Sequence, residues 1–221
     1  MRLAIFDLDN TLLAGDSDAE WGRFLVKIKA VDAEQYAAAN EGFYQDYKNG
    51  CLDIQAYLRF ALTPLKEHPI AQLQAWHEQF MRETIRPMIA PGTAELLAKH
   101  RASGDLMMIV TATNQFVTGP IAQELGFEHL LATPVDYDEQ GQPSGSSTGI
   151  PCFQDGKILR LNAWLETHGY VWEDFSETWF YSDSRNDLPL LRRVSHPVAV
   201  DPDDALRAEA EACDWRLISL R

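Results

Sequence analysis

Short apolar runs alternate with amphipathic patterns along most of the chain. Four runs lack the polar alternation of a half-exposed strand, and these are LAIF (3–6), LMMIVTA (106–112), TWFYS (178–182) and PVAV (197–200). Continuous runs of this kind are typical of parallel strands that are covered on both faces. A fifth run, WRLISL (215–220), predicts an edge strand.

Helical patterns separate these runs. Residues 91–104 have Pro and Gly at their start and a Gly at their end, as helices often do. Residues 157–169 place four apolar residues on one face, namely Ile158, Leu161, Trp164 and Leu165. This alternation predicts an α/β fold, with a Rossmann-like parallel sheet and helices on both of its faces.

One long segment departs from this rhythm. Residues 15–88 contain only helical patterns, and they are too long for an ordinary strand-to-strand crossover. We therefore predict a helical cap domain over 15–88, inserted into an α/β core made of 1–14 and 89–221. Residues 137–156 are rich in Gly, Ser and Pro, which predicts a hairpin or loop.

Composition narrows the classes of partner. The chain has 33 acidic against 19 basic residues, a formal net charge of −14, and no basic stripe. Such a chain repels nucleic acids and anionic membranes. The sequence shows neither a signal peptide nor a run long enough to span a membrane. Three widely separated cysteines fit no disulfide framework or metal motif, so we expect a cytoplasmic protein.

Acidic residues gather at the predicted carboxyl ends of the strands. Asp7 and Asp9 follow the first strand, Thr111 ends the second, and Asp183 and Asp187 follow TWFYS. In open α/β sheets ligands bind at this edge. Four acids converging there would repel one another without a cation, and Mg²⁺ is a hard ion that takes oxygen ligands. No His or Cys pair offers a zinc-like alternative.

Several of these residues have a simpler interpretation. Asp187 precedes LPLL and could be a helix N-cap, and Asn114 could be a cap or turn residue. Thr111 alone means little, because Thr is common in strands. Lys157 begins a helix, where a cation opposes the helix dipole at a cost of a few tenths of a kcal/mol. That cost favours a functional Lys157, although a solvated lysine is an alternative.

Together these residues resemble the haloacid dehalogenase superfamily of phosphohydrolases. DLDNT (7–11) fits the first motif of that family, Asp-x-Asp-x-Thr, and VTATN (110–114) fits its strand ending in Thr or Ser. GK (156–157) supplies the motif Lys, and SDSRND (182–187) fits the motif with two acids. The motifs span the chain in the family's order. The helical insert after the first motif is similar to the cap of subfamily IB, as in phosphoserine phosphatase.

The resemblance implies a phosphatase that works through an aspartyl-phosphate. Asp7 would be the nucleophile, and Asp9 would protonate the leaving alcohol and then activate water. Strand periodicity predicts that positions 7 and 9 face the same phosphoryl group. The cap would close over the site and exclude water while the intermediate forms.

The resemblance also implies a set of ligands for metal and phosphate. Mg²⁺ would be held by Asp7, the backbone carbonyl of Asp9 and Asp183, with Asp187 as a further ligand or a neighbour of one. Phosphate oxygens would be bound by three residues outside that set: Thr111, Asn114 and Lys157.

Substrate identity depends on other positions. Asp16 lies where phosphoserine phosphatases carry a Glu that contacts the substrate amine, so Asp16, with Asp18, would select an ester bearing a cationic amine. Solvated loop acids or a helix N-cap are the alternatives. Arg59 could meet a substrate carboxylate or lie on an exposed helix face. Ser182-Asp183-Ser184 replaces the usual Gly-Asp-Gly of phosphoserine phosphatases, which leaves that substrate in doubt.

A subgroup with histidinol-phosphate phosphatase activity is similar to this chain in FDLDNTLL, TATN, PCFQ-x-GK and YSDS-x-NDLPLL. Histidinol phosphate, which has an amine and no carboxylate, is therefore favoured over phosphoserine. A phosphotransferase of the same superfamily would share every motif. A receiver-like signalling module is a more distant alternative, because it lacks a long cap. We expect a small phosphorylated metabolite as partner, no nucleic acid or membrane, and a monomer or homodimer.

Overall fold

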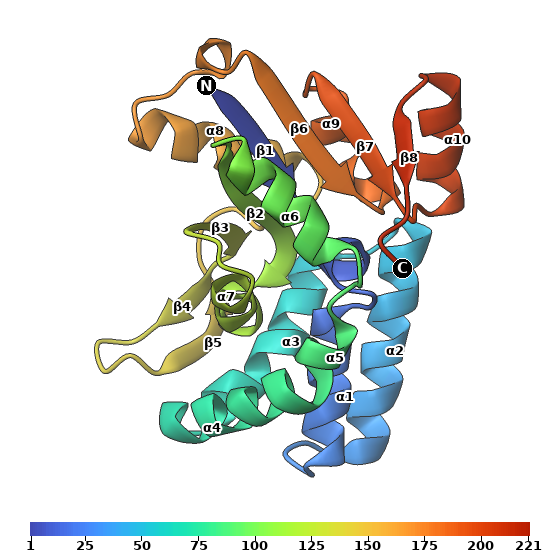
Figure 1. The fold of residues 1–221 in the computed structure, drawn as a ribbon. Helices are drawn as coiled ribbons and strands as arrows, with labels where there is room; N and C mark the ends of the chain where they lie inside the picture. Colours follow the sequence, from blue (N-terminus) through green and yellow to red (C-terminus); the bar gives the residue numbers. More distant parts are fainter.

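The computed structural model describes residues 1–221, and a six-stranded parallel sheet forms its centre. The strand order is β3-β2-β1-β6-β7-β8. The bounds are β1 (Arg2–Phe6), β2 (Leu106–Asn114), β3 (His129–Thr133), β6 (Glu177–Ser182), β7 (His196–Val200) and β8 (Arg216–Ile218). The predicted α/β fold is confirmed, and β8 is an edge strand as its sequence indicated (Figure 1).

The opposite edge strand, β3, is absent from the sequence prediction. Its sequence, HLLAT, has only two large apolar residues in succession, and the first two of its five residues are half-buried. An edge strand has a partner on one side only, so it needs a weaker apolar signal than a central strand. The four strands that carry a strong apolar run are the inner ones.

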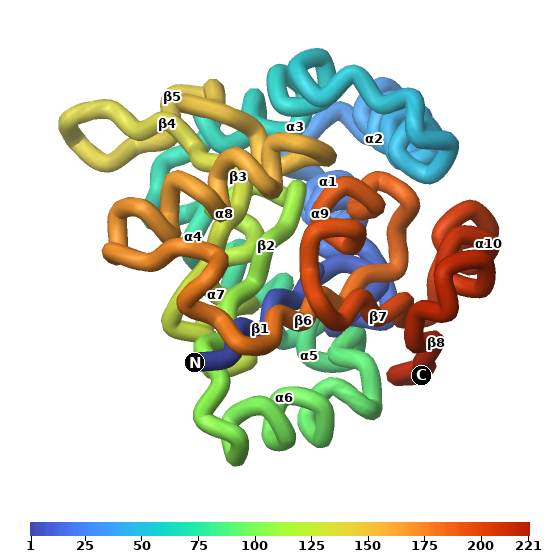
Figure 2. Tube along the Cα trace, turned by 90° about the horizontal axis from the view of Figure 1, so that it is seen from above, coloured from blue at the N-terminus to red at the C-terminus, as the bar shows by residue number.

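Helices cover both faces of the sheet, as predicted. Alternate residues of β1 point to opposite faces: Ala4 and Phe6 belong to one hydrophobic cluster, and Leu3 and Ile5 to the other. The first cluster includes residues of α6 (Thr93–Ala102) and α7 (Gln115–Glu124). The second includes residues of α8 (Asp155–Thr167), α9 (Leu188–Leu191) and α10 (Asp204–Ala212). Figure 2 shows α6 on one side of the sheet and α8 and α9 on the other.

The segment between β1 and β2 is a helical insert, which confirms the helical prediction for this region. Its main helices are α1 (Ser17–Lys27), α2 (Ala33–Asn49), α3 (Ile54–Glu67) and α4 (Ile70–Phe80), followed by α5 (Arg86–Met88). Two backbone hydrogen bonds close the insert, from Ala14 N to Met88 O (2.7 Å) and from Ala90 N to Leu12 O (3.0 Å). In Figure 1 the insert lies beyond the end of the sheet toward which β6 and β7 point.

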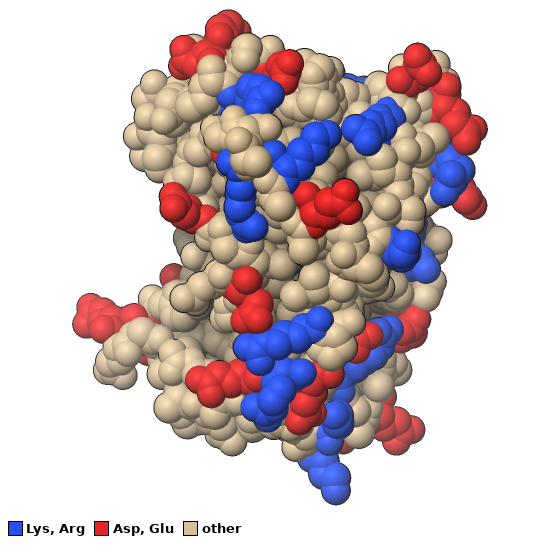
Figure 3. Space-filling model, in the orientation of Figure 1, with Lys and Arg blue, Asp and Glu red and all other residues tan.

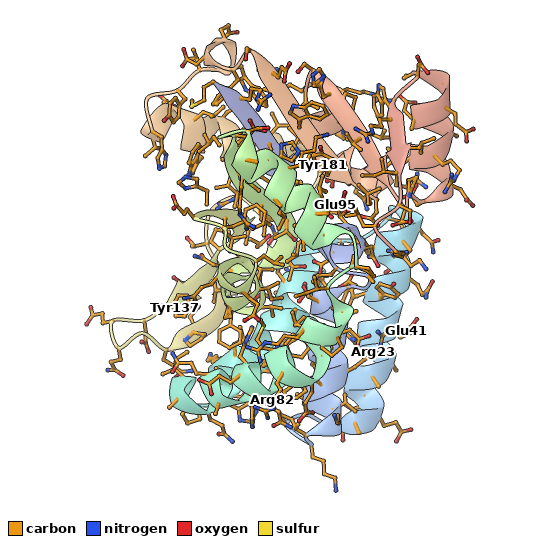
Figure 4. The ribbon with its side chains drawn as sticks, viewed as in Figure 1. Arg23, Glu41, Arg82, Glu95, Tyr137 and Tyr181 are labelled. Atoms are coloured by element: carbon orange, nitrogen blue, oxygen red, sulfur yellow. The ribbon has the colours of Figure 1, made fainter.

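Helices α1 and α2 pack closely because of one glycine. A Cβ atom at Gly22 would lie 2.6 Å from Oδ1 of Asn40, so any larger residue would push the helices apart. Asn40 is buried, and its Nδ2 donates to the backbone carbonyl of Ala19 (3.0 Å). Arg23 and Glu41 form an ion pair across the same two helices (3.4 Å; Figure 4). These contacts fix which side of α2 faces the sheet.

A β-hairpin lies within the Gly- and Ser-rich segment for which a hairpin or loop is predicted. Its strands β4 (Val135–Tyr137) and β5 (Pro143–Ser147) are antiparallel. The hairpin also contacts the insert, since Gln142 Nε2 donates to the carbonyls of Leu65 (3.0 Å) and His68 (2.8 Å). The core therefore contacts α3 as well as the two chain connections of the insert.

Charged side chains of both signs are mixed on the face shown in Figure 3. Two exposed ion pairs illustrate this mixing, Lys27 with Glu83 (2.9 Å) and Arg86 with Glu124 (2.9 Å). Exposed pairs of this kind contribute about 0 to 1 kcal/mol each, so they have little influence on the fold. None of the helices combines the length and apolar character needed to cross a lipid bilayer.

Candidate active site

The predicted site residues meet at the carboxyl ends of β1, β2 and β6. Phe6, the last residue of β1, pairs with Ile109 of β2 on one side and Tyr181 of β6 on the other. The next backbone amide, that of Asp7, donates to the carbonyl of Tyr181 (2.9 Å). From β1 the chain continues to β2 and β3 on one side, and it later returns to β6 on the other side of β1. Such a switch point in strand order opens a crevice for ligands.

A tight turn follows β1 and carries Asp9. Asn10 has a φ of 57°, a left-handed conformation that asparagine tolerates, and its amide donates to the carbonyl of Gly15 (2.8 Å). Asp7 and Asp9 line the same pocket, as predicted. The reason given by strand periodicity is wrong, however, because β1 ends at Phe6 and the turn alone orients Asp9.

Lys157 is the cation of the site. Its Nζ lies 2.8 Å from the carboxylate of Asp7 and 2.7 Å from that of Asp187, and its side chain is only 3% exposed. The alternative of a solvated lysine is therefore wrong. Burial opposes the charged form, but the carboxylates of Asp187 and Asp7 outweigh burial and raise the pKa of Lys157. The ammonium group stays charged at neutral pH and lies behind Asp7, paired with the two carboxylates.

The Asp187 side chain binds Lys157 and does not cap a helix. It occupies the position before α9, yet its side chain caps no backbone amide there. Its carboxylate accepts hydrogen bonds from Lys157 Nζ and from Ser182 Oγ, each at 2.7 Å. The N-cap interpretation is thus wrong. Ser182 stands where phosphoserine phosphatases usually have the first Gly of Gly-Asp-Gly. Its hydroxyl donates a hydrogen bond that holds the Asp187 carboxylate in place.

Thr11 lies between the carboxylate of Asp7 and that of Asp183. Its Oγ1 is 3.3 Å from Asp7 and 3.3 Å from Asp183, and it accepts from the amide of Asp183 (3.1 Å). The pKa of Asp7 is raised to about 7, chiefly by burial. The charge of Lys157 opposes this rise, and the charge of Asp187 adds to it. Burial, followed by Asp7 and Asp187, raises the pKa of Asp183 well above its usual value. Lys157 pairs with Asp7 and Asp187, while Asp183 has no cationic side chain within ion-pair distance.

This excess of negative charge fits a divalent cation. Asp7 and Asp183 both approach Thr11, so their oxygens flank one small region. No three Asp, Glu, His or Cys side chains are placed to hold a metal by themselves. A Mg²⁺ ion there would need the two carboxylates together with backbone carbonyl and water oxygens, which is common for this ion. The donor set therefore fits Mg²⁺.

Asp9 is held away from that region. One carboxylate oxygen accepts from the amide of Ser17 (2.6 Å) and the other from Thr113 Oγ1 (2.7 Å). Burial, with a contribution from Asp16, raises the pKa of Asp9 to about 6, while hydrogen bonds from Ser17 and Thr113 oppose that rise. A carboxyl group with such a pKa can donate and accept a proton near neutral pH. Both of its carboxylate oxygens are occupied by Ser17 and Thr113, which leaves its backbone carbonyl as the candidate metal ligand.

The two candidate phosphate residues on β2 differ in their surroundings. Thr111 is buried, and it lines the pocket together with Thr113. Asn114 does not line the pocket: its Oδ1 accepts from the amide of Val117 (3.1 Å) at the start of α7, and its Nδ2 donates to Asp18 (3.3 Å). Asn114 therefore matches its alternative interpretation as a helix cap, and it also orients Asp18.

Asp16 and Asp18 both line the pocket from the start of α1. One oxygen of Asp16 accepts from the amides of Asp18 (3.0 Å) and Ala19 (2.9 Å), which makes it the N-cap of α1. Burial raises the pKa of Asp16 to about 6. Burial also raises the pKa of Asp18, to about 7. Asp16 is thus both a cap and a pocket residue, and neither acid has a basic partner.

A pocket with a cavity volume of about 40 Å³ lies between the sheet and the insert. Four carboxylates and several aromatic rings form its wall, and no Lys, Arg or His side chain lines it; the residues are Asp7, Asp9, Asp16, Asp18, Ala19, Asn40, Phe43, Tyr44, Tyr47, Leu52, Ile54, Tyr57, Thr111, Ala112 and Thr113. Arg59 lies on an exposed part of α3 and does not reach this wall, in agreement with its exposed-face interpretation.

Sequence reasoning missed the aromatic wall. Phe43, Tyr44 and Tyr47 follow Asn40 at helical spacing on α2, so one face of that helix carries four pocket residues. This spacing is visible in the sequence as NEGFYQDY (40–47). The same pattern is typical of a helix that packs on a core, and only the position of α2 over the sheet edge separates the two possibilities.

Comparison with known proteins identifies the family to which these site residues belong. A profile of haloacid dehalogenase-like hydrolases matches residues 4–192. The chain is 43% identical over 220 residues to the histidinol-phosphatase of Neisseria meningitidis, covering 100% of this chain and 99% of that protein. It is 31% identical over 221 residues to phosphoserine phosphatase SerB1 of Mycobacterium tuberculosis, covering 99% of this chain and 70% of that protein.

A solved structure is also very similar. The protein of unknown function from Bordetella pertussis Tohama I shares 43% identity and a TM-score of 0.94, and the match covers 100% of this chain and 99% of that one. The matched profile covers all four motifs, and the residues of these motifs converge around Asp7 and Lys157. The chain therefore belongs to the haloacid dehalogenase-like hydrolases, as a phosphatase of the phosphoserine-phosphatase-like group.

Proposed function

We propose that this phosphatase hydrolyses histidinol phosphate with Mg²⁺ as its cofactor. The observation that carries the proposal is the pocket wall, which combines four carboxylates with aromatic rings and has no basic side chain. The carboxylates of Asp16 and Asp18 would attract the cationic amine of the substrate. The amine could also lie against the aromatic rings of the pocket wall. The 43% identity with a histidinol-phosphatase over the whole chain supports the same substrate.

The same wall disfavours phosphoserine. That substrate carries a carboxylate besides its phosphate, and the carboxylate would enter a pocket that already holds Asp9, Asp16 and Asp18. Like charges in a poorly solvated pocket repel strongly unless a cation lies between them. Arg59, the sequence candidate for that cation, is exposed on α3.

The residues of the site can perform phosphoryl transfer to Asp7. Lys157 and Thr111 would bind phosphoryl oxygens, while the Asp7 carboxylate attacks phosphorus and the ester oxygen leaves with the proton of Asp9. Asp9 would then take a proton from water as that water attacks the aspartyl-phosphate and releases phosphate. Asp7, Asp183 and the Asp9 carbonyl would hold Mg²⁺, which would neutralise the charge between nucleophile and phosphate.

The proposal has two further parts. The boundary of the insert at 15–88 is proposed to mark a cap domain, supported by the closing hydrogen bonds near Leu12 and Ala90. A cytoplasmic location is proposed because Cys51, Cys152 and Cys213 are all unpaired.

A panel of phosphate esters tests the substrate. Purified protein in Mg²⁺ is given histidinol phosphate, phosphoserine or p-nitrophenyl phosphate, and released phosphate is measured. We expect kcat/KM for histidinol phosphate to exceed that for phosphoserine by roughly 100-fold or more, because one unpaired buried charge costs a few kcal/mol. A chelator should abolish turnover, and Mg²⁺ should restore it. Equal turnover of all three esters would refute the assignment to histidinol phosphate.

A further inference from the structure

Tyr47 is a pocket residue of the insert that lies beside the turn carrying Asp183 and Asp187. Asn186, in the turn between Asp183 and Asp187, donates from Nδ2 to the backbone carbonyl of Tyr47 (3.3 Å). The ring of Tyr47 also faces the ring of Phe153, just before α8, with 6.3 Å between ring centres. Two segments of the core therefore hold this part of α2 over the site.

The Tyr47 hydroxyl has no hydrogen-bond partner in the chain, although Tyr47 lines the pocket with Asp7 and Thr111. Burial, followed by the carboxylates of Asp183 and Asp7, raises the pKa of Tyr47 well above its usual value. The hydroxyl group consequently remains protonated and is a hydrogen-bond donor at all physiological pH values.

The other two tyrosines of the wall have different surroundings. The ring of Tyr44 lies near two cations, 5.6 Å from Arg23 and 5.4 Å from Lys48. Tyr57 lines the pocket together with Asp18, on the side expected to receive the leaving group. Among the three, Tyr47 alone is attached through its backbone to the turn that carries Asp183 and Asp187.

We propose that the hydroxyl of Tyr47 donates a hydrogen bond to a phosphoryl oxygen of the bound substrate, as a binding residue supplied by the insert. The inference rests on the proposed phosphatase mechanism at this pocket but not on histidinol as the leaving group. Lys157 and Thr111 would reach the phosphoryl group from the sheet, and Tyr47 would reach it from α2. Binding of phosphate would therefore favour the arrangement in which α2 lies against the turn of Asn186.

The test is Tyr47→Phe, which keeps the ring and removes the donor. Wild-type and variant proteins in Mg²⁺ are titrated with inorganic orthophosphate by calorimetry, and KM is measured for histidinol phosphate and for p-nitrophenyl phosphate. A hydrogen bond to a charged group contributes about 1.5 to 3 kcal/mol. We expect the Kd for orthophosphate and both KM values to rise roughly tenfold or more. Tyr137→Phe is the control, because Tyr137 is exposed on the hairpin away from the pocket (Figure 4).

The outcomes separate this inference from the proposed function. An unchanged orthophosphate Kd in Tyr47→Phe would overturn the inference, and so would a loss confined to the amine-bearing ester. A shift of the melting temperature by added orthophosphate that is smaller in the variant than in wild type would support it, even if the variant is less stable. Weak turnover of histidinol phosphate by the wild type would instead count against the substrate alone.

Discussion

Two groups of carboxylates line this site, and their electrostatic environments differ. Asp7 and Asp187 lie within 2.8 Å of the buried ammonium of Lys157. Asp16 accepts from two backbone amides and Asp18 from Asn114, with no basic side chain beside them. The first group carries its counterion within the fold, whereas the second lacks one. This difference supports the proposal that the first group performs the chemistry and that the second binds the cationic amine of the substrate.

Loss of the nucleophile should give the largest effect. Asp7→Asn preserves the shape of the side chain but removes the attacking charge, so kcat should fall by at least about 1000-fold for every ester. Release of phosphate from p-nitrophenyl phosphate measures this. Asp32→Asn is the matched control, since Asp32 is an exposed N-cap of α2 and Asn caps equally well. Substantial activity in Asp7→Asn would refute the aspartyl-phosphate mechanism.

Removal of the shared cation tests the first group directly. Lys157→Met leaves Asp7 and Asp187 buried without a partner, which should lower the free energy of unfolding at pH 8 by about 3 to 5 kcal/mol. The loss should shrink toward pH 5, because Asp7, whose pKa burial raises to about 7, then becomes protonated. Urea unfolding of the metal-free protein, followed by circular dichroism, measures it.

Lys27→Met is the control for that experiment. Lys27 also forms an ion pair at 2.9 Å, with Glu83, but its side chain is 66% exposed. Its loss should change the free energy of unfolding by less than about 1 kcal/mol. Equal losses for the two lysines would mean that the buried carboxylates do not depend on Lys157.

The second group should govern selectivity. In Asp16→Asn and Asp18→Asn the polar contacts of the pocket persist, and Asn at position 16 still caps α1. The ratio of kcat/KM for histidinol phosphate to that for p-nitrophenyl phosphate should fall roughly tenfold in each variant, as expected for one lost charge interaction of about 1.4 kcal/mol. An unchanged ratio in both variants would exclude these acids as the amine-binding residues.

The smallest expected effect is on stability and depends on pH. Burial raises the pKa of Asp18 to about 7 in the folded chain, from an ordinary value of 3.8. The unfolded chain therefore releases this proton at lower pH than the folded chain does, so the free energy of unfolding decreases as pH rises from about 4 to 7. Asp18→Asn removes that decrease and should stabilise the metal-free protein by about 1 to 2 kcal/mol at pH 8.

At pH 4 the same substitution should be nearly neutral, because Asp18 is then protonated in the folded chain. Parallel urea titrations at the two pH values check this. Asp138→Asn, in the exposed hairpin turn, provides the comparison. A stabilisation of equal size at both pH values would show that charge on Asp18 is not its cause.

Much of this arrangement follows from sequence, for physical reasons. Parallel strands end at one edge, so acids after the first and third apolar runs had to lie close together. Lys157 was identifiable because a cation in the first turn of a helix is unfavourable without another role. The fold class and the helical insert follow from periodicity, which depends only on neighbouring residues.

Other features depend on contacts between distant segments. Asp187 follows a strand and precedes a helix, and its sequence alone fits a cap as well as a partner for Lys157. The spacing of Phe43 and Tyr47 predicts an ordinary packed helix face. Only the position of α2 over the strand ends shows that they line a pocket. Thr113 binds Asp9 across 104 positions of sequence, and no local pattern indicates that contact. The domain boundary at 15–88 stays a prediction.

The close approach of α1 and α2 at Gly22 has a consequence for how substrate preference can change. It fixes the side of α2 that bears Asn40, Phe43, Tyr44 and Tyr47, and these four face a reaction centre built on separate strands. Asn40 holds α2 against α1 and Tyr47 is the proposed phosphate donor, so Phe43 and Tyr44 are the positions at which substitution is expected to change the preferred alcohol.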